Sequence, residues 1–321
     1  MKSALISTFA RIFRWSGVVV LNYHRVGDGS GSVFDRGLWS SAADAFAEQV
    51  RFCKVHFDVI SPRDLPDVLA RRRGRHVLIT FDDGYRDNYE VAFPILRSEG
   101  AAATFFVATG FIDAPRVPWW DEIAWMVRTS TRETVELPGC LAAPVRFDGP
   151  DRESAVRTLL RTYKSMPEQA TDTYLNTIAD ATGSGRYDPR AGGEWWMTWD
   201  MLREMQASGM TIGGHTVNHP VLASASREVQ RQEIEACGDR LAAELGEPMR
   251  YFSYPVGGSA AFNSVTRECL REAGVQYAFS YYSGYRQFGE WDDYDIRRVP
   301  VESYLSRDAF RSIVELPQLC A

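Results

Sequence analysis

The sequence feature that most constrains the fold is a repeated pattern in which short apolar runs end in polar residues. The run Val18–Leu21 leads into Asn-Tyr-His, and the run His76–Phe81 leads into Asp-Asp-Gly. Unbroken β-branched and aliphatic runs of this length are typical of parallel strands covered on both faces. The polar residues then lie at the carboxyl ends of the strands, where α/β barrels build their active sites.

Helical segments alternate with such strands along most of the chain. Further strands are expected near 58–60, 103–107, 210–212, 250–253, 277–279 and 296–299. Roughly seven strands in alternation with helices favour an α/β fold, a distorted or incomplete (β/α) barrel, over an open doubly wound sheet. No glycine-rich phosphate-binding motif follows a strand, so nucleotide cofactors have no support.

The alternation breaks between about residues 111 and 197, where prolines are frequent. Helical patterns near 122–127 and 153–163 predict a structured insertion rather than a flexible linker. Two tryptophan pairs flank it, and they either stack on sugar rings or anchor the insertion to the main core: Trp119 with Trp120, and Trp195 with Trp196. We therefore expect one barrel domain over 18–321, interrupted by this insertion and preceded by a separate segment, residues 1–17.

Charge and cysteine content bear on the partners of the protein. The net charge of −6, from 36 basic and 42 acidic residues, argues against a nucleic-acid partner, because such a partner needs a concentrated basic surface. The 5 cysteines are widely spaced and form no CxxC pattern. They fit neither a disulfide framework nor a thiolate zinc site, so reduced thiols are expected.

The N-terminal segment has apolar residues at helical spacing, interrupted by Arg11 and Arg14. The two arginines and the lack of a cleavage signal argue against a secretory signal peptide. The pattern leaves two interpretations open, a helix in a membrane interface or a helix docked on the domain itself. The expected location is cytoplasmic. If the N-terminal helix lies in a membrane interface, the protein would also contact the inner face of the membrane.

Three polar clusters follow predicted strands, so a barrel would bring them to one end. They are His24, the pair Asp82 and Asp83, and the pair His215 and His219. Two histidines at this spacing can approach one ion, although such a pair alone more often caps loops. Adjacent carboxylates repel each other and need a compensating cation or proton. Together the clusters indicate a divalent metal site in which one carboxylate remains free as a base.

Two of these clusters lie in recognisable motifs. Residues 80–84 (Thr-Phe-Asp-Asp-Gly) and 215–219 (His-Thr-Val-Asn-His) resemble the first and second motifs of the polysaccharide deacetylase (NodB-homology) superfamily of carbohydrate esterases. The resemblance extends over about 18–110 and 197–300. It implies a distorted (β/α) barrel and a divalent metal, usually zinc. By position it implies that Asp82 is the general base and that the metal ligands are Asp83, His215 and His219.

The third motif departs from the family pattern. Secreted members often have Arg-x-Pro-Tyr-Gly where this chain has Ser-Tyr-Pro-Val-Gly at 253–257, so the arginine that orients the base is missing. Arg298, at the end of a late strand, is the expected replacement, with a surface salt bridge as the alternative interpretation. Tyr254 and the backbone N–H near Val256 are expected at the substrate and oxyanion positions.

The catalytic acid of the family is also missing from its usual place, because no histidine follows His219. Leu-Asn-Tyr-His at 21–24 resembles instead the N-terminal Tyr-His motif of the biofilm-polysaccharide branch, whose elements are circularly shifted. His24 then replaces the missing acid, and the alternative is a structural histidine at a strand end.

The function expected from these residues is hydrolysis by a metal-dependent enzyme that removes N-acetyl groups from sugars. The substrate would be a polysaccharide, an oligosaccharide or a lipid-linked glycan. An O-acetyl ester or a non-sugar amide is the alternative substrate on the same fold. A non-catalytic carbohydrate-binding protein is the remaining alternative, but it would normally have lost Asp82, Asp83 or a ligand histidine.

Overall fold

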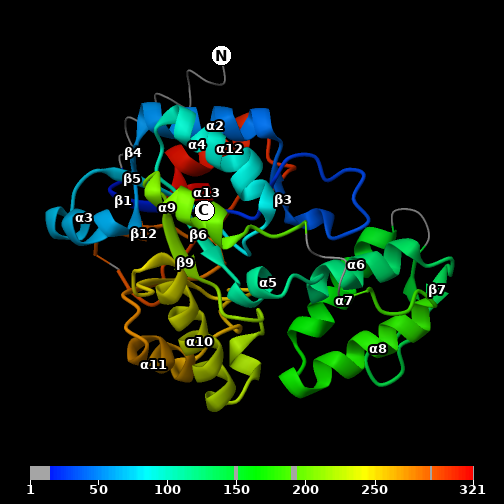
Figure 1. Ribbon diagram of the computed structural model, residues 1–321. Coiled ribbons are helices and arrows are strands. Elements are labelled where there is room, and N and C mark those ends of the chain that lie inside the picture. The colour runs from blue at the N-terminus through cyan, green and yellow to red at the C-terminus, as the bar shows by residue number, and fades with distance from the viewer. Residues whose placement is uncertain (1–14, 148–150, 189–193, 290, 321) are drawn as a thin grey trace.

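The computed structural model of the protein describes residues 15–147, 151–188, 194–289 and 291–320. Its centre is a sheet of parallel strands in the spatial order β11, β10, β9, β6, β5 and β1. Figure 1 labels β9, β6, β5 and β1 of this sheet. The α/β fold expected from the sequence is confirmed. These strands are β1 (Gly17–Tyr23), β5 (Arg75–Phe81), β6 (Thr104–Val107), β9 (Thr211–Gly214), β10 (Tyr251–Ser253) and β11 (Tyr277–Phe279).

A late segment joins the two edges of this sheet. Ile296 pairs in parallel with Phe279 of β11, and Val299 of β13 (Val299–Pro300) pairs with Leu21 of β1. The sheet therefore curls into a distorted barrel. The prediction of a continuous strand over 296–299 is wrong, because this segment passes from the β11 edge of the sheet to the β1 edge instead of pairing with one strand along its length.

Each central strand buries both of its faces, as the apolar runs predict. In β1, Val18 and Val20 belong to a cluster with Leu78 and Phe106, whereas Val19 and Leu21 belong to the larger core beneath the helices. Alternation with period two places the first set inside the barrel. Asp82 continues the inward-facing positions of β5 beyond the end of the strand.

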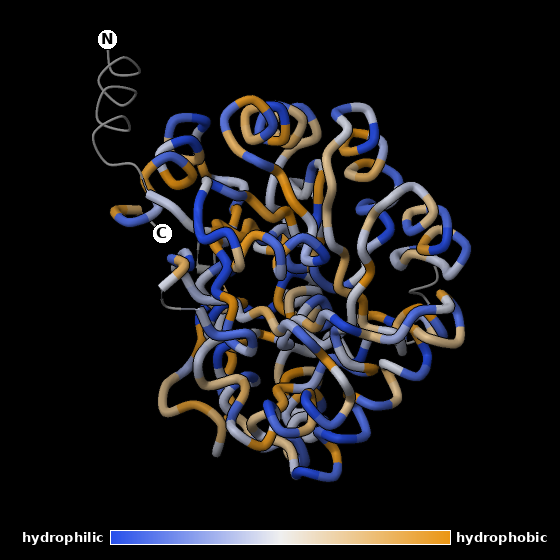
Figure 2. Tube along the Cα trace, turned by 90° about the vertical axis from the view of Figure 1, so that its left-hand side faces the viewer, coloured by the Kyte–Doolittle hydropathy of each residue, from blue (hydrophilic) through white to orange (hydrophobic). Residues whose placement is uncertain are grey.

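Helices cover the outside of the barrel. Figure 2 shows that they carry both hydrophobic and hydrophilic residues, as expected for helices packed on one face. A short strand, β4 (Asp58–Ile60), pairs with the start of β5. The covering helices are α2 (Ala43–His56), α3 (Leu65–Arg71), α4 (Phe93–Glu99), α9 (Trp199–Ala207), α10 (Arg227–Leu245), α11 (Ser264–Glu272), α12 (Arg307–Glu315) and α13 (Pro317–Cys320).

The segment after β6 forms a helical lobe beside the barrel (Figure 1). After α5 (Thr109–Asp113), it contains the helices α6 (Trp119–Thr129), α7 (Asp151–Lys164) and α8 (Thr171–Thr182) and the short hairpin β7 (Thr134–Val135) and β8 (Val145–Arg146). The lobe has a hydrophobic core of its own. Trp196 anchors it, because its buried ring stacks on Tyr85 and Phe111 at centroid distances of 4.7 and 4.5 Å.

Of the N-terminal segment, residues 1–14 lie outside the described residues. Trp15 packs on the barrel, with its ring 5.9 Å from that of Phe57 and its Nε1 donating to the carbonyl of Glu315. No helix in the described part of the chain is long and apolar enough to cross a membrane. The five cysteines all lie in the described ranges and are free, as expected.

Candidate active site

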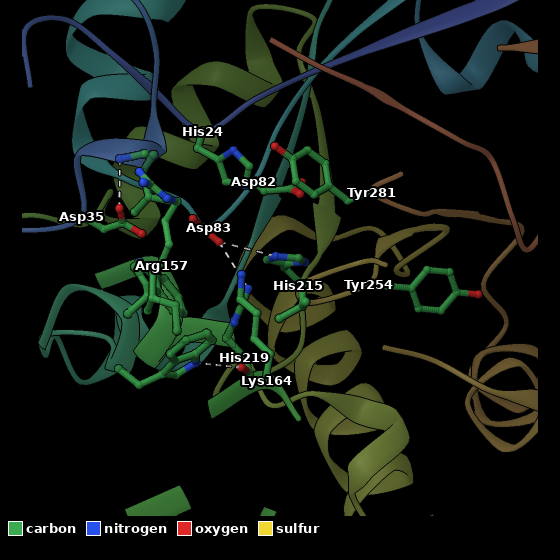
Figure 3. A pocket seen from close by; sticks show the side chains of 16 residues that line it. His24, Asp35, Asp82, Asp83, Arg157, Lys164, His215, His219, Tyr254 and Tyr281 are labelled. Carbon is green, nitrogen blue, oxygen red and sulfur yellow. Dashed lines mark hydrogen bonds and ion pairs between the residues drawn. The ribbon is translucent and has the colours of Figure 1, made fainter. Parts of the chain in front are cut away.

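Three side chains that could hold a metal ion lie at the carboxyl ends of β5 and β9. Asp83 follows β5, and His215 and His219 lie in the loop after β9. Their ligand atoms all lie within 4.8 Å of one another, and all three residues are buried. The Nε2 atoms of His215 and His219 each lie 3.5 Å from Oδ1 of Asp83 (Figure 3). We refer to these three residues as the ligand group.

The spacing of the ligand group fits a metal ion. An N···O separation of 3.5 Å is long for a hydrogen bond. Ligands bound at about 2.1 Å in a tetrahedral arrangement would lie about 3.4 Å apart. Two imidazoles and a carboxylate are also a donor set typical of zinc and similar divalent ions, and three protein ligands leave a position open.

Proton positions on the histidines also suit a ligand role. The Nδ1 of His215 lies 2.7 Å from the carbonyl oxygen of Ser253. A carbonyl only accepts, so Nδ1 donates to it, and Nε2 is the ring nitrogen that faces Asp83. Burial, together with the charge of His215, lowers the pKa of His219 to about 3, so its ring is neutral. Burial acts to lower the pKa of His215 too, but Asp82 and Asp83 outweigh burial and raise it.

Asp82 is not part of the ligand group and pairs with Arg298 instead. The Nη1 and Nη2 atoms of Arg298 donate to the two carboxylate oxygens at 2.8 and 2.7 Å, and Ser253 Oγ donates at 3.1 Å. Burial acts to raise the pKa of Asp82, but the charge of Arg298 outweighs it and holds that pKa below its usual range. The carboxylate is thus ionised and fixed in direction. Arg298 is fully buried, so its alternative interpretation as a surface salt bridge is wrong.

His24 lines the same pocket without joining the ligand group. The register of β1 and β5 pairs Tyr23 with Phe81, so His24 and Asp82 begin neighbouring loops. Its ring packs edge-on against Tyr281 at 5.4 Å between centroids. Its backbone is held by Ser40 Oγ at one end and by Asn88 Nδ2 at the other. Figure 3 shows the imidazole beside Asp82 and above the ligand group.

The backbone around the pocket is strained. Among the described residues, positive φ angles of non-glycine residues occur at Arg72 and at four positions in these loops, with values of 77°, 67°, 57° and 62° for Asp83, Thr216, His219 and Val256. Such angles cost free energy in residues with a Cβ atom and persist where the surrounding structure imposes them. Their concentration here is typical of a functional site.

Two residues of the third motif, Tyr254 and Val256, line the pocket. Val256 lines the pocket, and its backbone N–H makes no hydrogen bond within the described ranges. The side chain of Tyr254 points away from the ligand group (Figure 3), its ring stacks on Phe262, and its hydroxyl donates to the carbonyl of Tyr294. Tyr254 is also among the residues that line the pocket, although its ring packs in the core, so its place at the substrate position stays a prediction.

Several site residues carried no signal in the sequence. The carboxylate of Glu233 in α10 accepts the N–H groups of Val217 and Asn218 at 2.9 and 2.8 Å and so holds the loop between the two ligand histidines. A lone glutamate on a helix has no pattern that could reveal this contact. The pocket, of about 220 Å³, is also walled by Trp119 and Trp120, which the sequence singled out, and by residues that it did not: Asp35, Gly37, Leu38, Arg157, Leu160 and Lys164.

Comparison with known proteins places this site in a family. The model of the polysaccharide deacetylase family matches residues 70–133 and 148–278, which include two of the three polar clusters, Asp82 with Asp83 and His215 with His219, but not His24. The chain belongs to the polysaccharide deacetylase family. By its description, this is a family of deacetylases, a class of hydrolase, that act on polysaccharides. The Bacillus subtilis protein YxkH, described as a polysaccharide deacetylase, is 61% identical over 54 residues, a match that spans 19% of that relative and 16% of this chain.

Solved deacetylase structures share the fold of this family member along most of its length. The Streptococcus pyogenes deacetylase PplD, in complex with acetate, has a TM-score of 0.61 at 19% identity and covers 95% of this chain and 98% of its own. IcaB from Ammonifex degensii has a TM-score of 0.58 at 21% identity, with 94% and 97% covered. The deacetylase domain of BpsB from Bordetella bronchiseptica has a TM-score of 0.56 at 19% identity, with 90% and 97% covered.

Proposed function

We propose that this family member is a metal-dependent N-deacetylase that acts on N-acetylated sugars of a polysaccharide, an oligosaccharide or a lipid-linked glycan. The observation that carries the proposal is the arrangement of two neighbouring carboxylates with different partners. Asp83 faces His215 and His219, whereas Asp82 faces Arg298. One carboxylate is thus available to a cation and the other to a proton.

Zinc is the ion that this donor set favours, and Asp83, His215 and His219 would hold it. The chemistry that a bound divalent ion supplies is polarisation of the acyl carbonyl and acidification of water. In this proposal Asp82 receives the proton of the attacking water, and Arg298 keeps Asp82 ionised and aimed at the pocket. The N–H of Val256 would donate to the oxyanion of the tetrahedral intermediate.

His24 supplies the remaining proton. An amide nitrogen leaves only when it is protonated, so N-deacetylation needs an acid on the side of the leaving group. His24 is the histidine that lines the pocket outside the ligand group. The edge-on contact with Tyr281 and the two backbone hydrogen bonds hold the imidazole in place while leaving it partly exposed to the pocket.

Acetate release tests this function directly. The zinc-loaded protein is incubated with N-acetylglucosamine oligomers, with acetylated xylan and with a cyclic amide, for which the ring-opened product is measured instead of acetate. We expect acetate from the oligomers and loss of that activity after treatment with a chelator. Release from acetylated xylan alone would reassign the enzyme as an O-acetyl esterase. Chelator-insensitive release would contradict the role of the ligand group.

A further inference from the structure

Two basic side chains of the lobe line the pocket. Arg157 and Lys164 lie on α7 with Leu160 between them, and the spacing of three and four residues places all three on one face of the helix. Figure 3 shows Arg157 and Asp35 on one side of the ligand group, with Tyr254 and Tyr281 on the other. The lobe thus adds positive charge to a pocket whose barrel side carries Asp82 and Asp83.

Neither basic side chain has a hydrogen bond or an ion pair within the described ranges. Two other arginines of the lobe are fully engaged: Arg128 binds both oxygens of Glu153, and Arg186 binds both oxygens of Glu122. Arg157 has an electrostatic interaction with Glu153, a carboxylate that Arg128 already occupies. Lys164 lies 6.0 Å from the centre of the Trp119 ring and interacts at longer range with Asp35 and Asp83.

Two unpaired cations on a pocket wall are suited to an anionic ligand. A guanidinium binds phosphate or carboxylate through paired hydrogen bonds, and an ammonium group adds a mobile point charge. The protein as a whole carries a net charge of −6, which disfavours the approach of an anion, so local cations at the entrance would matter for its capture. An aromatic wall adjoins them, because Trp119 stacks on Tyr163 at 4.0 Å between centroids.

We propose that Arg157 and Lys164 form an anion subsite of the deacetylase pocket and that the substrate carries a negative group beside its N-acetylated sugar. This inference rests on the proposed function and narrows the substrate to anionic glycans. The negative group is either a phosphate ester of the sugar or the carboxylate of a neighbouring uronic acid. The barrel then holds the acetamido group, and α7 holds the anion.

The test compares three substrates that share one N-acetylated sugar. They are methyl N-acetylglucosaminide, which is neutral, N-acetylglucosamine 1-phosphate, and a disaccharide of glucuronic acid and N-acetylglucosamine. We expect a kcat/KM for one of the charged substrates at least about tenfold above that of the neutral one, falling as salt screens the charges. Whichever charged substrate shows the preference identifies the anion as phosphate or carboxylate.

The variants R157Q, K164Q and the double variant are measured as the ratio of kcat/KM between charged and neutral substrates. We expect each single variant to lower this ratio several-fold and the double variant to abolish the preference. R73Q, which removes the same charge from an exposed position outside the pocket, is the control and should keep the ratio. Melting temperatures show whether each variant is folded.

Calorimetry separates this inference from the deacetylase assignment. If no acetate is released from any substrate, the proposed function fails, and the binding measurement then tests the subsite. The subsite is supported if the double variant binds N-acetylglucosamine 1-phosphate or the disaccharide at least fivefold more weakly than the wild type does. Equal binding to the wild type and the double variant overturns it. A wild type that hydrolyses all three substrates with similar kcat/KM, or an R73Q effect equal to those of R157Q and K164Q, also overturns the subsite.

Discussion

The barrel and the lobe each bury a carboxylate, and they stabilise it in opposite ways. In the barrel, Asp82 pairs with Arg298 and its pKa is lowered. At the base of the lobe, the donors to Asp121 of α6 among the described residues are neutral, the hydroxyl of Tyr85 at 2.7 Å and the N–H of Asp35 at 2.9 Å. Burial there raises the pKa of Asp121 to about 7.

The opposite pKa shifts of Asp82 and Asp121 indicate that the two buried carboxyls have different roles. The barrel keeps charges in its interior because each has a fixed partner, and such charges can bind a cation or exchange a proton. At the base of the lobe, the buried carboxyl of Asp121 links α6 to the loop that follows β5, through Tyr85, and to the loop that contains Asp35. Chemistry should therefore depend on the barrel residues, and stability at high pH should depend on the carboxyl of the lobe.

Removal of a residue of the ligand group should have the largest effect on the chemistry assigned to the barrel. His215→Ala leaves Asp83 and His219 as a two-ligand site, so we expect loss of bound zinc and at least roughly 10³-fold lower kcat/KM. Metal analysis of the purified variant and acetate release are the measurements. His56→Ala, at an exposed histidine of α2, is the control and should keep both zinc and activity.

Asp82→Asn separates the two neighbouring carboxylates. We expect zinc to stay bound while kcat falls roughly 10²–10⁴-fold, because the amide cannot accept a proton. Zinc content and kcat are measured on the same preparation. If this variant loses its zinc, the assigned roles of Asp82 and Asp83 must be exchanged.

His24→Ala tests the acid on the other side of the pocket. Zinc should remain, and amide hydrolysis should fall by roughly 10²-fold or more, whereas an activated aryl acetate, whose leaving group needs no proton, should lose much less. The measurement is the ratio of kcat/KM for the two substrates. An equal loss on both would instead indicate a structural or positioning role for His24.

Asp121→Asn tests whether the buried carboxyl of the lobe makes stability depend on pH. An aspartate has a pKa of about 3.9 when unfolded, so a folded pKa of about 7 means that the native state binds the extra proton between these pH values. The stability that this proton provides is present below pH 4 and is lost as the pH rises through 7. The wild type should therefore lose stability over this range, by roughly 2–4 kcal/mol from this group.

The asparagine variant should lack that pH dependence. Its free energy of unfolding, relative to that of the wild type, should therefore increase between pH 5 and pH 8. Denaturant titrations at several pH values measure this difference. Asp180→Asn changes an exposed carboxylate of α8 and should follow the wild type. Parallel curves for the wild type and Asp121→Asn would show that Asp121 is ionised in the folded protein.

Local patterns predicted a large part of the fold and of the site. The apolar runs of β1 and β5 identified buried strands because residues on both faces of such strands avoid water. The Asp-Asp pair and the His-x-x-x-His spacing identified the ligand group because each lies within one loop. The direction of the Tyr254 ring could not be predicted, since a motif places the backbone of a turn but not the direction of each ring.

The sequence by itself determined which side chains follow strand ends, because that is a property of neighbouring residues. Only the tertiary structure decided which of them meet. Arg298 reaches Asp82 across 216 residues because the segment from Ile296 to Val299 closes the barrel. Arg157 and Lys164 reach the pocket because the lobe folds back beside it. Contacts of this kind depend on strand order and domain packing, which no local periodicity records.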